Sequence, residues 1–88
     1  MRKYPKGCRF IVAADGEIGP KCKITQACDI QDVAMRCAGS GRPLKFVAVQ
    51  PRGKLKWLLF RVHWGEYPRL QDRGDDPDVL LVKAMLLG

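Results

Sequence analysis

The stretch LKFVAVQPRGKLKWLLFRVHW, residues 44–64, decides the fold of this chain, because it holds two apolar runs separated by a turn. The first run, residues 44–50, is rich in the β-branched and aromatic residues that favour strands. The Pro-Arg-Gly of residues 51–53 favours a turn, and residues 54–64 predict a second, longer strand. Apolar side chains occupy both faces of this second strand, which indicates a central strand or one whose second face meets a partner.

Two further strand candidates precede this stretch. RFIVAA, residues 9–14, has the composition of a strand and is followed by an Asp-Gly turn signal. In KCKITQ, residues 21–26, the apolar Cys22 and Ile24 alternate with two lysines and a threonine, so one face is apolar and the other cationic. We expect the two segments to form an antiparallel hairpin.

Residues 29–38 form the clearest helix candidate, because their apolar side chains recur at i, i+3, i+4 and i+7 and so share one face. Asp29 is a good N-cap, and Asp32 follows it at the spacing of a capping box. Gly39 lies where a left-handed cap ends many helices. The apolar face comprises Ile30, Val33, Ala34 and Cys37.

The C-terminal part divides into a polar and an apolar segment. Residues 65–78 lack periodicity and are rich in turn formers, which predicts a loop. Residues 79–87 are apolar nearly all round and fit a helix or a strand, although Asp76-Pro77-Asp78 is typical of a helix start.

The predicted fold class is therefore α+β. We expect one domain over residues 1–88, with two layers: an antiparallel sheet of four or five strands and one helix packed on a face. The predicted order is strand, strand, helix, strand, strand, then the C-terminal helix or strand. Residues 9–64 form the core of this prediction, residues 65–78 the loop and residues 79–87 the apolar terminal element.

Positive charge is concentrated in the first two thirds of the chain. The chain has 16 Lys and Arg against 9 Asp and Glu, a net charge of +7. Residues 1–64 carry +9, whereas residues 65–88 carry −2. Such a field attracts nucleic acid, an acidic protein face or an anionic membrane, although it also serves solubility alone.

The basic residues of the predicted strands and turns are the candidate binding site. Cations that alternate on strands and lie beside aromatic residues suit a phosphate backbone with unstacked bases. The alternative is a solvated sheet face whose lysine stems cover apolar surface, with the tryptophans in the core. The candidate contacts to nucleic acid or another partner are Lys21, Lys23, Arg42, Lys45, Arg52, Lys54, Lys56 and Trp57.

The sequence holds no convincing catalytic or metal-binding motif, so we expect a protein that is not an enzyme and takes no cofactor or metal. The four cysteines, at positions 8, 22, 28 and 37, form no CxxC pair, and His63 is the only histidine. Reduced thiols and an intracellular, cytoplasmic setting are expected, because no secretory signal or membrane span is visible. A nucleophilic cysteine activated by His63 remains a remote alternative.

The layout from Phe10 to Trp64 resembles that of small phage anti-CRISPR proteins, some of which insert one helix after the first hairpin of an antiparallel sheet. The similar segments are FIVAAD, KITQACDIQDVAMRCAG and LKFVAVQPRGKLKWLLFRVHW. The resemblance implies a non-catalytic inhibitor of a CRISPR surveillance complex, whose basic residues occupy a guide-RNA or DNA channel. The contacts it implies here are Lys21, Lys23, Arg52, Lys54 and Lys56.

The leading hypothesis is a basic binding protein that occludes a polyanionic surface, of nucleic acid or of a nucleoprotein. The alternative is a protein–protein or homodimerisation domain that uses the apolar segment from Val79 to Leu87.

Overall fold

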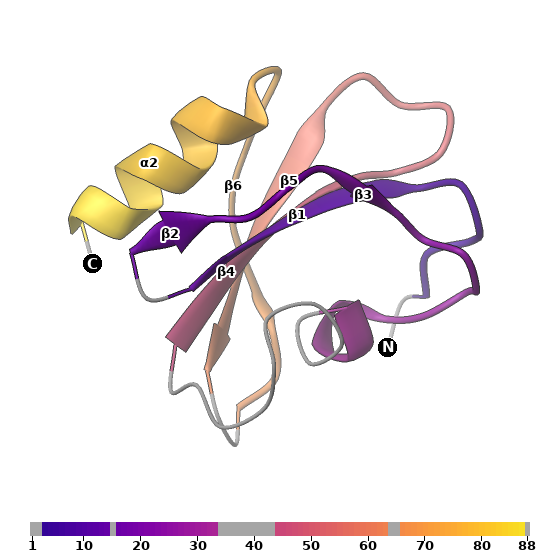
Figure 1. The fold of residues 1–88 in the computed structure, drawn as a ribbon, viewed down its shortest axis with the longest axis horizontal. Coiled ribbons are helices and arrows are strands. Elements are labelled where there is room, and N and C mark those ends of the chain that lie inside the picture. The colour runs from indigo at the N-terminus through magenta and orange to yellow at the C-terminus, as the bar shows by residue number, and fades with distance from the viewer. Residues whose placement is uncertain (1–2, 15, 34–43, 64–65, 88) are drawn as a thin grey trace.

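An antiparallel sheet forms the centre of the computed structural model, which describes residues 3–14, 16–33, 44–63 and 66–87, with the backbone alone at residues 44 and 45. Its strand order is β2-β1-β4-β5-β6, and β3 pairs with β1 (Figure 1). The α+β class predicted from the sequence is confirmed. The elements are β1 (Arg9–Ala14), β2 (Glu17–Ile18), β3 (Cys22–Lys23), β4 (Leu44–Gln50), β5 (Trp57–His63), β6 (Arg69–Gly74) and α2 (Pro77–Leu87).

The three long strands β1, β4 and β5 form the middle of the sheet. β4 pairs antiparallel with β1 on one side, where Val47 lies opposite Val12, and with β5 on the other, where it lies opposite Phe60. β5 lies between β4 and β6, and both its faces are apolar because each packs in a core cluster: Trp57 and Leu59 on one side of the sheet, Val62 on the other.

The sheet is covered on both faces, so the fold has one layer more than the sequence predicted. On one face, Val47 and Val49 pack with Ile30 and Val33 of the helical turn at residues 30–33. On the other face, the alternate residues of β4 pack with α2. Figure 1 shows the helical turn and α2 on opposite sides of the sheet. The cluster beneath α2 contains Ile11, Ala13, Phe46, Ala48, Trp57, Leu59, Leu80, Leu81 and Ala84.

The predicted cap of the first helix is present. The N–H of Asp32 donates to Oδ1 of Asp29 over 2.9 Å, and the N–H of Asp29 donates back to Oδ2 of Asp32 over 3.5 Å. This reciprocal pair satisfies backbone donors that the first turn leaves free. Residues 34–38 of the predicted helix lie outside the described residues.

The predicted loop at residues 65–78 contains a strand, β6, and that part of the prediction is wrong. All its residues but Gly74 are exposed, so burial imposes no alternation of polar and apolar side chains. Pairing with β5 defines the strand instead, and the register shifts between Leu59 and Phe60. Two other predicted strands are shorter than expected: residues 21–26 contribute only β3, and residues 54–56 precede β5.

The C-terminal segment is a helix, which resolves the two alternatives left by its sequence. Oδ1 of Asp76 accepts the N–H of Asp78 at 3.0 Å and that of Val79 at 3.5 Å, so Asp76 is the N-cap. Pro77 occupies the first helical position, where its missing N–H costs nothing. None of the described helices has the length and apolarity needed to cross a bilayer.

Candidate polyanion interface

Three chain segments meet at one end of the sheet. The N–H of Gly7 donates to the carbonyl of Ile24 over 2.9 Å, and the N–H of Ile24 donates to the carbonyl of Cys8 over 2.8 Å. In the β4–β5 turn, the N–H of Arg52 donates to Sγ of Cys8 over 3.3 Å. Cys8 is fully buried, so it ties the segments around residues 7, 24 and 52 together from beneath the surface.

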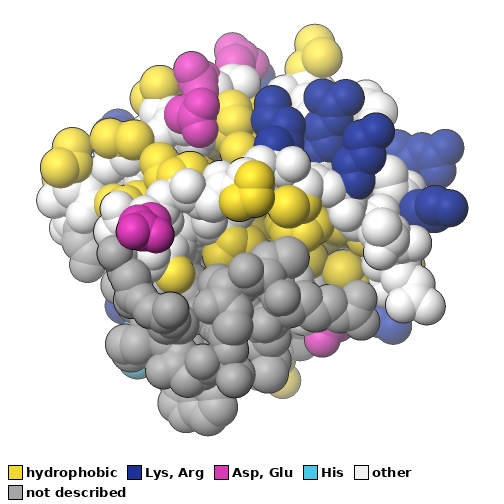
Figure 2. Space-filling view, in the orientation of Figure 1, with side chains coloured by type: hydrophobic (Ala, Val, Ile, Leu, Met, Phe, Trp, Pro, Cys, Tyr) yellow, Lys and Arg dark blue, Asp and Glu magenta, His cyan; other side chains and the backbone are white. Residues whose placement is uncertain are grey.

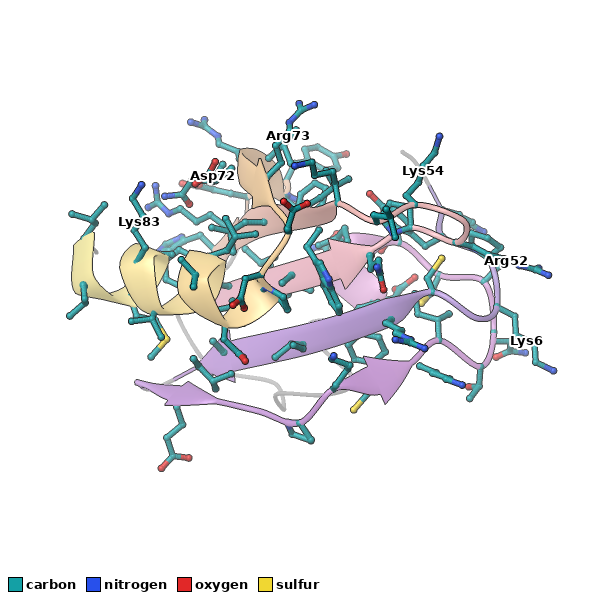
Figure 3. The ribbon with its side chains drawn as sticks, turned by 90° about the horizontal axis from the view of Figure 1, so that it is seen from above. Lys6, Arg52, Lys54, Asp72, Arg73 and Lys83 are labelled. Atoms are coloured by element: carbon teal, nitrogen blue, oxygen red, sulfur yellow. The ribbon has the colours of Figure 1, made fainter. Side chains whose placement is uncertain are left out.

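Exposed cations from these segments and from β1 gather at this end. Figure 2 shows Lys and Arg side chains concentrated on one side of the molecule, and Figure 3 shows Lys6, Arg52 and Lys54 at the end of the ribbon opposite Lys83. Arg9 and Lys23 are directly opposed across β1 and β3 and therefore point to the same side. We call the following set of exposed residues the cationic end: Lys6, Arg9, Lys21, Lys23, Arg52 and Lys54.

Trp57 lies beneath this surface. Its side chain is 4% exposed and packs in the cluster under α2. Nζ of Lys21 lies 5.5 Å from the centroid of the indole ring, within the range of a cation–π contact. The predicted role of Trp57 as a platform for bases is therefore replaced by a structural one: its ring packs in the core and positions Lys21.

The cations differ in their acidic neighbours. Nζ of Lys56 lies 3.0 Å from Oδ1 of Asp75, so this lysine is paired. Within the described residues, no carboxylate lies within ion-pair distance of the six side chains of the cationic end. Their charges are therefore available to an external anion.

The seven basic residues among the predicted contacts separate into three groups. Lys21, Lys23, Arg52 and Lys54 are brought together at the cationic end, and Lys56 is already paired. Residue 45 lies opposite Ala14 and Val62, away from the β4–β5 turn, and its side chain is outside the described residues, as is Arg42.

The sequence prediction did not include Lys6 and Arg9. Arg9 was recoverable, because it begins a predicted strand whose hairpin partner carries Lys23. Lys6 precedes every predicted element. The hydrogen bonds of Gly7 and Cys8 hold it at this end, and no pattern in the sequence predicts those bonds.

The cysteines and the histidine carry the other side chains with reactive chemistry. Cys8 and Cys28 are buried, and Cys22 is half-buried. Nδ1 of His63 lies 4.0 Å from Oε1 of Glu66. Across the part of the chain that the structure describes, no three His, Cys, Asp or Glu side chains lie close enough together to hold a metal ion.

Comparison with known proteins adds nothing to this geometry: no protein-family model matches the chain, and neither a curated protein nor a solved structure matches it.

Proposed function

We propose that this chain is a binding protein whose cationic end covers a polyanionic surface. One observation carries the proposal: six exposed cations from three chain segments and β1 share one end of the molecule, and Lys56, which is paired with Asp75, lies outside that set. Clustered, unpaired cations lower the free energy of a phosphate backbone that approaches them, chiefly by releasing its counterions.

The mechanism is occlusion. Cations on strands and turns contact phosphates and fix the position of the protein, whereas base sequence is read by groups that reach the base edges. With Trp57 buried, the described surface at this end offers charges without an aromatic platform beside them. We therefore propose a partner recognised by its phosphates, either nucleic acid or a nucleoprotein. A CRISPR effector complex is the partner that the resemblance of layout favours.

A pair of matched triple variants tests the proposal. Lys6→Gln/Arg52→Gln/Lys54→Gln removes three charges from the cationic end, and Arg61→Gln/Arg69→Gln/Arg73→Gln removes three exposed charges of β5 and β6. Affinity for a labelled 20-nucleotide probe, single-stranded or duplex, is measured by anisotropy against salt. If about four phosphates are contacted, wild-type affinity falls roughly a hundredfold between 50 and 200 mM salt.

The two triples are expected to separate. The first loses most of its affinity and its log–log salt slope is reduced by about 2–3, because each lost phosphate contact removes roughly 0.7–0.9. The second retains a slope close to wild type. Equal losses in the two variants, or a wild-type affinity that ignores salt, would contradict a localised site. Pull-downs with and without nuclease then distinguish nucleic acid from a protein partner.

A further inference from the structure

The outer face of α2 is an apolar surface that the rest of the described chain leaves uncovered. Leu80, Leu81 and Ala84 face the sheet and are buried. On the opposite side of the helix, Val79 and Leu86 are 59% and 81% exposed. The surface there forms a shallow groove of about 470 Å³, lined by Asp78, Val79, Val82, Lys83, Leu86 and Leu87.

The exposed apolar residues have the spacing of a helix–helix seam. Val79, Val82 and Leu86 are separated by three and then four residues, which is the a-d-a pattern of a heptad. All three seam positions are apolar, as knobs-into-holes packing between two helices requires. Such a seam is completed by a second helix with the same pattern, and another copy of this chain supplies one.

The charged residues beside the seam select the orientation of the second helix. With Val79 at a, Asp78 is at g and Lys83 is at e. In a parallel pair each g residue approaches the e residue five positions later in the other helix, so Asp78 of one copy meets Lys83 of the other. In an antiparallel pair e faces e, and the two Lys83 side chains would repel each other.

The distribution of charge favours contact between copies at this end. Residues 65–88 carry a net −2, whereas residues 1–64 carry +9. Two copies that approach through α2 therefore keep their most positive regions apart. Figure 3 shows Lys83 at the opposite end of the molecule from Lys6, Arg52 and Lys54, so contact through α2 leaves these three cations open.

The helix is already ordered before a second copy arrives. An isolated helix of 11 residues would be marginal in water. Here Asp76 caps it, and Leu81, which is fully buried, fixes it to the sheet. We propose that the chain forms a homodimer by parallel pairing of α2 from two copies, with Val79, Val82 and Leu86 in the seam and Asp78–Lys83 ion pairs across it.

Sedimentation of the full chain tests the seam. The wild type is expected at twice its 9.9 kDa mass, and Val82→Asp at the monomer mass. Leu55→Asp is the matched control, because Leu55 is 84% exposed outside α2, and it should remain dimeric. Circular dichroism establishes that both variants are folded. A wild type that stays monomeric at high concentration, or a Val82→Asp variant that is still a dimer, overturns the proposal. The exposed face of α2 would then bind a protein of different sequence.

Charge exchange and cross-linking test the orientation. Asp78→Lys and Lys83→Glu should each be monomeric, since each places like charges at both pairs, and an equimolar mixture should regain the dimer mass. Leu86→Cys should form a disulfide between copies on oxidation, in excess of any formed by the wild type, because parallel pairing sets the two residues side by side. An Asp78→Lys dimer, or an absence of the Leu86→Cys cross-link, rules out the parallel pair.

The dimer and the polyanion site are independent. A folded Val82→Asp monomer should keep the salt slope of the wild type on a probe short enough to occupy a single cationic end, while losing avidity on a longer one. Loss of the dimer therefore leaves the proposed function standing, and loss of the salt slope leaves the dimer standing.

Discussion

The cationic end and the outer face of α2 are two exposed surfaces built in opposite ways. The first gathers charges from residues near 6, 23 and 52, which only the sheet brings together. The second belongs to one continuous helix, whose outward residues are apolar. The comparison teaches that a surface formed by distant segments depends on the whole sheet, whereas one formed by a helix depends on how that helix is held.

The two surfaces also differ in the force that acts on them. Contacts between exposed cations and phosphates weaken steeply with salt. Burial of Val79, Val82 and Leu86 depends on the removal of apolar area from water, which salt does not screen. Salt should therefore separate the two activities, with polyanion binding lost first.

The largest expected effect distinguishes the inner from the outer side of α2. Leu81→Ala should lower the free energy of unfolding by roughly 2–5 kcal/mol, because it removes a fully buried side chain and leaves a cavity between α2 and β4. Leu87→Ala is the matched control: the same chemical change at a residue that is 78% exposed should stay within about 0.5 kcal/mol. Urea denaturation measures both, and equal costs would mean that α2 is not anchored to the sheet.

A smaller effect is expected at the cap of α2. Asp76→Ala should cost about 1 kcal/mol, because the N–H groups of Asp78 and Val79 lose their acceptor. In a domain of this size that corresponds to a fall in Tm of about 4–8 °C. Asp76→Asn retains an acceptor oxygen and should recover most of the loss. An unchanged Tm in Asp76→Ala would show that the Asp76 cap does not stabilise α2.

The smallest effect sharpens the boundary of the cationic end. Lys56 and Asp75 form an ion pair whose side chains are 62% and 77% exposed, so Lys56→Gln should cost at most about 0.2–1 kcal/mol of stability. Its effect on polyanion affinity should be weaker than that of Lys54→Gln, because Lys54 has no ion pair with a described carboxylate. Anisotropy titrations at low salt compare the two, and a larger loss in Lys56→Gln would move the boundary to include Lys56.

Locally coded features of the fold were predictable from the sequence. The strands at residues 9–14 and 44–50 have the predicted bounds, because their β-branched and aromatic composition favours strands wherever they lie. The caps at Asp29 and Asp76 are also as predicted, since a side chain that accepts nearby N–H groups depends on neighbours only a few residues away. The composition of residues 79–87 predicted an apolar terminal element, but it did not decide between a helix and a strand.

Features set by pairing were not predictable. β6 has no pattern of its own, and β5 defines it as an edge strand. Of the predicted contacts, Lys21, Lys23, Arg52 and Lys54 lie at one end of the sheet, whereas Trp57 is buried.

The sequence by itself determined that positive charge lies in the first two thirds of the chain and that two long apolar strands flank a turn. The tertiary structure alone decided which cations lie together, which side of α2 is exposed and that Trp57 is buried. The physical reason is that composition and short-range hydrogen bonds act within a few residues, whereas burial and proximity depend on strands and helices that are distant in sequence.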